Sequence, residues 1–247
     1  MLKTTISAYN GYEQHTFTCA GHEGTLILPH TPLKPGNRWI WRAEFLGAFD
    51  SVDRMLLERG WCLAYLRVSD MYGCPQAVEW MEEFRRLVVN EWDLCEKTVL
   101  EGFSRGGLYA CNFALTHPDK VSCLYLDAPV LGIRNWPAGL GTYPRWGGEE
   151  WEQCKRWYGV TDESILTFDR DPLDRFDELL DADIPVVLIC GLKDQAVYFP
   201  ENGQKLIDAY QRRDGKLMTV LKPDCDHHPH SVEDPTAVCD FIESVTA

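Results

Sequence analysis

The 247-residue sequence lacks an excess of positive charge. Its 38 aspartates and glutamates outnumber its 24 lysines and arginines, which leaves a formal net charge of −14. Nucleic acids and anionic membrane surfaces both bind a basic face. We therefore expect neither as a partner, although a local arginine could still hold a small anion.

Long apolar runs are also missing. No run approaches the length of about 18 residues that a membrane-spanning helix needs. The first residues show no charged segment followed by an apolar one, which is the pattern of a signal peptide. These absences predict a protein without a membrane span or a signal peptide, and we expect it to be cytoplasmic.

Motifs that bind cofactors and metals are scarce. The sequence has neither a Gly-x-Gly-x-x-Gly fingerprint nor a Gly-Lys-Ser/Thr element. Its ten cysteines never form a Cys-x-x-Cys pair, so we expect free and mostly buried thiols. His227-His228-x-His230 comes nearest to a metal motif, but its loop lacks the helical spacing that converges ligands. We therefore expect no cofactor and no metal.

The pattern of apolar residues predicts strands that alternate with helices. This order favours an α/β fold, with a mostly parallel sheet and helices on both faces. The length suits one domain, 1–247, with an insertion at about 130–183 that is rich in tryptophan and suggests a lid. The expected strands cover 4–28, with an inner strand at 24–29, then 61–68, 98–103, 121–126, 184–191 and 216–221, and the expected helices cover 50–59, 75–90, 108–116, 201–212 and 235–245.

Chemistry is concentrated in Gly102-Phe103-Ser104-Arg105-Gly106. This Gly-x-Ser-x-Gly element follows an apolar strand and precedes a helix, a context that is far rarer by chance than the five-residue pattern alone. Such a turn exposes the Ser104 hydroxyl beside a helix N-terminus, whose free N–H groups can stabilise an oxyanion. We interpret Ser104 as a nucleophile.

A serine needs a base, and the base needs a group that orients it. Asp194 follows the strand at 184–191, and His227 and His228 follow the strand at 216–221. Loops at one edge of a parallel sheet can bring such residues together. Asp127 is a rival for the acid, because it ends the strand at 121–126. His228 is a rival for the base, with His230 in third place.

The turn at Ser104, the acid loop and the histidine loop resemble, in order and spacing, the α/β-hydrolase family over nearly the whole chain. This resemblance, to its serine esterase and prolyl-oligopeptidase-like branch, implies a triad of Ser104, His227 and Asp194. One departure is Asp226, which stands where the family often has glycine. By family position, the backbone N–H groups of Arg105 and Trp39 would form the oxyanion hole.

Substrate contacts are harder to read from the sequence. Arg42 and Arg134 suit a substrate carboxylate, and Trp41 and Trp136 suit a sugar ring or an aryl group. The non-functional alternatives are surface solvation for the arginines and core packing for the tryptophans. Residues 35–42 and 227–231 also resemble segments of bacterial esterases that act on glycans.

We expect a serine hydrolase that cleaves a small or carbohydrate-linked carboxylic ester. The alternatives are a serine peptidase or amidase of the prolyl-oligopeptidase type and a non-catalytic binding protein of the same fold. The sequence leaves the oligomeric state undetermined.

Overall fold

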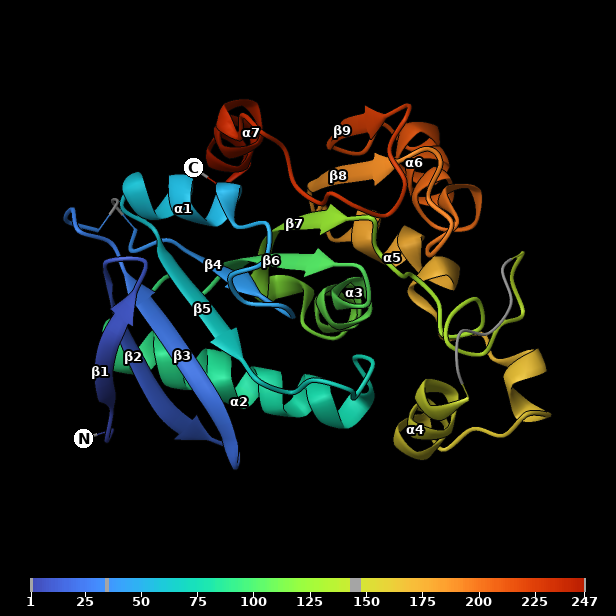
Figure 1. Ribbon diagram of the computed structural model, residues 1–247, viewed down its shortest axis with the longest axis horizontal. Helices are drawn as coiled ribbons and strands as arrows, with labels where there is room; N and C mark the ends of the chain where they lie inside the picture. The colour runs from blue at the N-terminus through green and yellow to red at the C-terminus, as the bar shows by residue number, and fades with distance from the viewer. Residues whose placement is uncertain (1, 34–35, 143–147, 247) are drawn as a thin grey trace.

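The computed structural model describes residues 2–33, 36–142 and 148–246 (Figure 1). Its centre is a nine-stranded sheet in the order β1-β2-β3-β5-β4-β6-β7-β8-β9. The first three strands pair antiparallel, β3 pairs antiparallel with β5, and the others are parallel. The strands are β1 Thr5–Tyr9, β2 Tyr12–Cys19, β3 His22–Leu28, β4 Trp39–Arg42, β5 Cys62–Leu66, β6 Thr98–Phe103, β7 Val121–Asp127, β8 Val186–Gly191 and β9 Leu217–Lys222.

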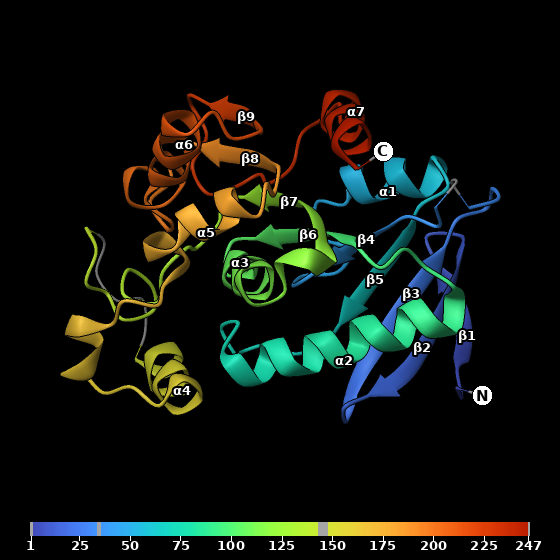
Figure 2. The same cartoon turned by 180° about the vertical axis from the view of Figure 1, so that it is seen from behind.

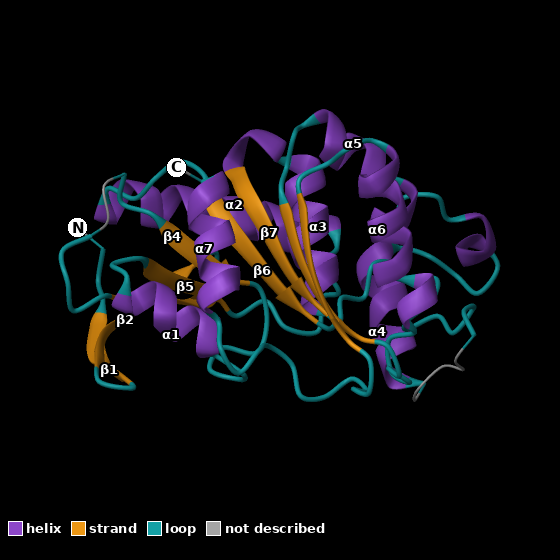
Figure 3. Ribbon diagram, turned by 90° about the horizontal axis from the view of Figure 1, so that it is seen from above, coloured by secondary structure: helices purple, strands orange, loops and turns teal. Residues whose placement is uncertain are grey.

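Helices cover both faces of this sheet, which confirms the predicted fold class (Figures 2 and 3). One apolar core joins one face to α2, α3, α5 and α6, and a second core joins the other face to α1 and α7. The helices are α1 Ser51–Glu58, α2 Pro75–Trp92, α3 Gly106–Thr116, α4 Glu149–Tyr158, α5 Phe176–Asp181, α6 Gly203–Arg212 and α7 Thr236–Val245. None of them has the length and apolarity that a bilayer crossing requires.

Strand β4 is the element that the sequence pattern misses. We expected residues 35–45 to form a loop after the inner strand, yet Trp39–Arg42 lies inside the sheet between β5 and β6. All four of its side chains are buried, so both faces of the strand are covered and no polar alternation marks it. The loop that leaves its carboxyl end therefore begins at Ala43.

The segment between β7 and β8 contains α4, α5 and two short 3-10 helices, Ser164–Thr167 and Pro172–Asp174. Together with Tyr72, Leu108 and Val197, its side chains form a third apolar cluster that includes Trp151 and Phe168. Figures 1 and 3 show α4 beyond the carboxyl ends of the parallel strands. Residues 143–147 of the expected insertion lie outside the described residues, and its role as a lid stays a prediction.

The turn from β6 into α3 depends on close backbone packing. A Cβ atom on Gly102 would lie 2.7 Å from the carbonyl oxygen of Gly106, and one on Gly107 would lie 2.6 Å from Cβ of Pro129. By contrast, a Cβ on Gly106 would have its nearest neighbour, a side-chain atom of Glu44, at 3.4 Å. Gly102 and Gly107 thus permit the approach of strand, turn and helix, and Gly106 contributes less to it.

The first prediction compares two glycines of this turn. Gly102→Ala should lower the free energy of unfolding by about 2 kcal/mol or more, because its new methyl group collides with backbone. Gly106→Ala should cost clearly less. Urea denaturation followed by circular dichroism measures both values. Equal losses at the two positions would contradict the close-approach explanation.

Candidate active site

Ser104 lies directly after β6 in a left-handed backbone conformation, with φ of +50°. This conformation is strained for a residue with a side chain and persists where its surroundings impose it. Its backbone N–H donates to the carbonyl of Asp127 at 2.9 Å, and its own carbonyl accepts from the N–H groups of Gly107 and Val130. These bonds fix the turn and leave the hydroxyl half-buried at the start of α3.

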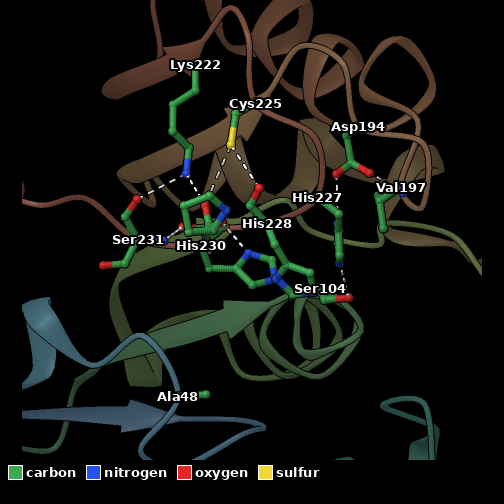
Figure 4. Close-up of polar contacts among 12 residues, drawn as sticks. Ala48, Ser104, Asp194, Val197, Lys222, Cys225, His227, His228, His230 and Ser231 are labelled. Carbon is green, nitrogen blue, oxygen red and sulfur yellow. Dashed lines mark hydrogen bonds and ion pairs between the residues drawn. The ribbon is translucent and has the colours of Figure 1, made fainter.

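His227 links the Ser104 hydroxyl to a buried carboxylate (Figure 4). Its Nε2 lies 3.0 Å from Ser104 Oγ, and its Nδ1 lies 2.8 Å from Asp194 Oδ2. The other Asp194 oxygen accepts the N–H groups of Ala196 and Val197 at 2.8 and 2.7 Å. An ionised Asp194 can only accept, so His227 carries its proton on Nδ1 and leaves Nε2 free to accept from Ser104.

Asp226 ties the loop after β9 to the loop after β8. Its Oδ1 accepts the N–H of Gln195 at 2.8 Å and that of His227 at 2.7 Å. These two N–H groups hold the pKa of Asp226 below its usual range. Where the resembling family often has glycine, this chain therefore uses a carboxylate that joins the two loops holding Asp194 and His227. Gly191 allows the approach, because a Cβ there would collide with the carbonyls of Cys225 and Asp226.

Asp127, the rival acid, serves a different histidine. Its Oδ1 lies 2.7 Å from Nδ1 of His230, and its Oδ2 accepts the N–H of Ser231 at 2.6 Å. Both Asp127 and His230 are buried. The structure thus holds two carboxylate–imidazole pairs of the same kind, Asp194 with His227 and Asp127 with His230. The Ser104 hydroxyl contacts His227, the imidazole of the first pair.

His228, the rival base, is exposed, and the Ser104 hydroxyl bonds to His227 and not to it. Burial lowers its pKa, and the nearby rings of His230 and His227 lower it further. A cavity of about 320 Å³ opens beside Ser104. The cavity is lined by Phe45, Ala48, Phe49, Phe103, Ser104, His227, His228 and His230. The three phenylalanines among them were not identified as site residues from the sequence.

Phe45 and Phe49 lie on the loop after β4, and both have positive φ, +58° and +51°. Their rings are 39% and 41% exposed, unusually open for phenylalanine. Phe49 stacks on His228 and meets His230 edge-on. The sequence would indicate that this loop reaches Ser104 only if β4 were recognised as the strand before it.

Trp39 and Trp41 do not reach the site, contrary to our expectation. Trp39 begins β4, at the sheet edge opposite Ser104, and its indole N–H donates to the carbonyl of Cys95 at 2.8 Å. Trp41 packs against Phe84 and Phe113 in the core. Trp39 therefore cannot supply an oxyanion donor, and Trp41 cannot contact substrate.

Arg42 is also misassigned as a substrate residue. Its guanidinium is buried and pairs with Asp53 at 2.5 Å and with Glu101 at 2.9 Å. It also donates to the backbone carbonyls of Glu44 and Ala48, which lie in the loop after β4. Arg42 therefore supports that loop from inside the protein, and its buried guanidinium is engaged by these four groups rather than presented to a ligand.

Glu101, one partner of Arg42, is fully buried. Burial raises its pKa well above the usual range, against the opposing charge of Arg42, and the nearby Asp53 raises it further. Its position directly before Gly102 places this charge network beneath the Ser104 turn.

Arg134 and Trp136 belong to the segment between β7 and β8. Arg134 pairs with Asp171 at 2.8 Å and with Asp174 at 2.5 Å, so its charge is used within that segment. Trp136 is half-buried and packs on Tyr72 with ring centres 5.6 Å apart. Neither residue lines the cavity beside Ser104, and both contacts are those of a structural role.

Arg105 carries the backbone N–H that follows Ser104, at the N-terminus of α3. Its side chain turns away to Asp70 and Glu44, at 2.7 and 3.3 Å. Burial raises the pKa of Glu44, and Arg105 counteracts this effect. The side chain thus braces the loop after β4 against α3 and leaves its backbone N–H at the site.

Comparison with known proteins gives concordant results. The sequence model described as the Alpha/beta hydrolase family matches residues 8–241. The fold resembles FphF, a fluorophosphonate-binding serine hydrolase of Staphylococcus aureus, with a TM-score of 0.66 and 17% identity over 100% of this chain and 98% of that one. It also resembles the esterase Pf2001 of Pyrococcus furiosus, with a TM-score of 0.62 and 13% identity over 100% and 94% of the two chains.

A third similar structure is dipeptidyl peptidase 4 of Porphyromonas gingivalis. The TM-score is 0.66 and the identity 12%, and the match covers 99% of this chain but only 35% of the peptidase. At these identities the three likenesses establish the shared fold.

The second prediction tests the corrected role of Arg42. Arg42→Met should lower the free energy of unfolding by about 3 kcal/mol, because it leaves buried carboxyl groups without their cation. Arg67→Met is a matched control, because the Arg67 side chain is 66% exposed and its ion pair with Glu23 is long, at 3.7 Å. This substitution should lower the free energy of unfolding by less than about 0.5 kcal/mol. Denaturant titration measures both. A stable Arg42→Met protein with a raised KM would restore the substrate role.

Proposed function

The chain belongs to the alpha/beta hydrolase family, and we propose that it is a serine hydrolase that cleaves carboxylic esters with an apolar group. In this proposal Ser104 is the nucleophile, His227 the general base and Asp194 the residue that orients His227. The observation that carries it is the unbroken hydrogen-bond chain from Ser104 through His227 to Asp194.

The reaction follows from this chain in two steps. His227 Nε2 takes the Ser104 proton as Oγ attacks the ester carbonyl, and the imidazolium then protonates the leaving alcohol. The resulting acyl-enzyme is attacked by water, from which Nε2 again removes a proton. Asp194 stabilises the transient imidazolium while its two backbone donors keep it oriented.

Two backbone N–H groups would stabilise the oxyanion. One belongs to Arg105, at the N-terminus of α3, where the helix dipole adds to the effect. For the second we propose Phe45, in place of Trp39. Phe45 follows β4 and lines the same cavity as Ser104, and the Arg105 guanidinium lies 5.2 Å from the centre of its ring.

The cavity beside Ser104 supports an apolar acyl or alcohol group. Phe45, Phe49 and Phe103 present aromatic carbon to it, and none of the described residues that line it is an aspartate, a glutamate or a lysine. Two of the residues that suggested a sugar-linked ester, Trp41 and Arg42, are buried away from the site. A volume of about 320 Å³ suits a short acyl chain or a phenyl ring.

The third prediction tests the mechanism. Ser104→Ala should lose turnover by about 10³-fold or more, and it should lose labelling by a fluorophosphonate probe. Hydrolysis of p-nitrophenyl butyrate measures the first and in-gel fluorescence the second. Intact hydrolysis, or labelling at another serine, would remove Ser104 as nucleophile.

Paired variants separate the rival residues within the same assays. Asp194→Asn should reduce kcat far more than Asp127→Asn, because it disturbs the tautomer of His227 rather than that of His230. Likewise, His227→Ala should lose far more turnover than His228→Ala. The reverse order in either pair would reassign that member of the triad.

The fourth prediction concerns substrate preference. The value of kcat/KM should be about 10-fold higher for p-nitrophenyl butyrate than for the acetate, because two more methylene groups enter the apolar cavity. Phe49→Ala should narrow this ratio, whereas Trp157→Ala, which removes a similarly exposed aromatic from α4, should not. Faster hydrolysis of aminoacyl p-nitroanilides than of any ester would favour the peptidase alternative.

A further inference from the structure

Three imidazoles lie close together beside Ser104, although their spacing in the sequence did not predict that they would converge. The rings of His227, His228 and His230 have centres 4.8 to 5.0 Å apart, and each pair is close to perpendicular. One ligand nitrogen from each lies within 4.8 Å of the other two. Figure 4 shows the three side chains on the same side of the site.

Two of these imidazoles are prepared as metal ligands. His227 and His230 each direct Nδ1 at a buried carboxylate, Asp194 and Asp127, at 2.8 and 2.7 Å. A carboxylate that accepts from Nδ1 fixes the neutral tautomer with its lone pair on Nε2, which is the arrangement behind metal-bound histidines in proteins.

The third imidazole completes the set from the solvent side. His228 is exposed, and its ring stacks on Phe49 beside the other two imidazoles. In a tetrahedral zinc site with Zn–N of about 2.0–2.1 Å, ligand nitrogens lie about 3.4 Å apart. The widest pair here, at most 4.8 Å, would close by about 1.4 Å.

We propose that His227, His228 and His230 form a binding site for one divalent zinc-type cation beside Ser104. Three neutral imidazoles and an open fourth position suit Zn²⁺, which imidazole binds well. The carboxylates behind the rings and the net charge of −14 favour a cation over an anion. Water or the Ser104 hydroxyl would fill the fourth position.

Occupancy of this site would switch off hydrolysis, a consequence that rests on the proposed function. The Nε2 lone pair of His227 that accepts the Ser104 proton is the same lone pair that would bind the metal. A metal-bound Nε2 cannot act as a base, so zinc would act as a reversible inhibitor. Chelation would restore activity.

Zinc binding is measured directly by calorimetric titration of the full chain with ZnCl₂. We expect one zinc per chain, with at least tenfold weaker binding in His228→Gln and in His230→Gln. His22→Gln is the matched control, because His22 packs on Trp80 at the far side of the sheet and belongs to no such cluster among the described residues. Absence of binding, or equal affinity in all variants, overturns the proposal.

A spectroscopic readout distinguishes histidine from cysteine ligands. Co²⁺ in place of zinc should give the strong visible absorption of a tetrahedral nitrogen site, and this absorption should be lost in His228→Gln. A thiolate charge-transfer band would assign the ion to a cysteine, such as the half-buried Cys225, and would overturn the proposal.

Inhibition is then measured with p-nitrophenyl butyrate, relative to the metal-free rate of each variant. The zinc concentration for half inhibition should match the calorimetric affinity and rise at least tenfold in His228→Gln. Zinc bound at the three histidines by a protein that hydrolyses nothing would leave the metal site standing and refute the proposed function. Zinc bound there without inhibition would refute the link between them.

Discussion

The hydrogen bond between Asp194 and His227 is the interaction on which the site depends. Two backbone N–H groups of its own loop hold one oxygen of Asp194, which directs the other oxygen at Nδ1 of His227. This direction selects the tautomer of His227 and places Nε2 at 3.0 Å from Ser104. A carboxylate held only by water would leave the imidazole free to rotate, and the serine would face a base of uncertain orientation.

The sheet edge converts this local bond into a stable arrangement. The loops after β8 and β9 are joined by the bonds of Asp226 to Gln195 and His227, and Gly191 lets their backbones meet. The strained turn at Ser104 is held by a bond to β7, through the carbonyl of Asp127. The same Asp127 orients His230 with its side chain. Four strand ends, those of β6, β7, β8 and β9, thus contribute to one small network.

The sequence predicts those parts of the site that depend on chain order. Ser104, Asp194 and His227 each follow a recognisable apolar strand, and the carboxyl ends of parallel strands meet at one edge. The fold class follows from the same alternation. The errors at Trp39, Trp41 and Arg42 come from β4: its four residues are buried on both faces, so nothing in their pattern distinguishes a central strand from an aromatic loop. Because this strand was not recognised, Trp39, Trp41 and Arg42 were assigned to the site, and Phe45 and Phe49 were not.

The metal proposal and the catalytic proposal share one physical origin. A general base and a metal ligand both need an imidazole lone pair that is accessible, and a hydrogen bond from the other ring nitrogen to a carboxylate orients the ring for either role. His227 meets this requirement for Ser104, and a second, similar pair, Asp127 with His230, stands beside it. A single imidazole of this kind binds a metal weakly, but three within 4.8 Å lower the entropic cost of collecting ligands. In the proposed metal site, the additional histidines would therefore give an affinity for cations that a single histidine would lack.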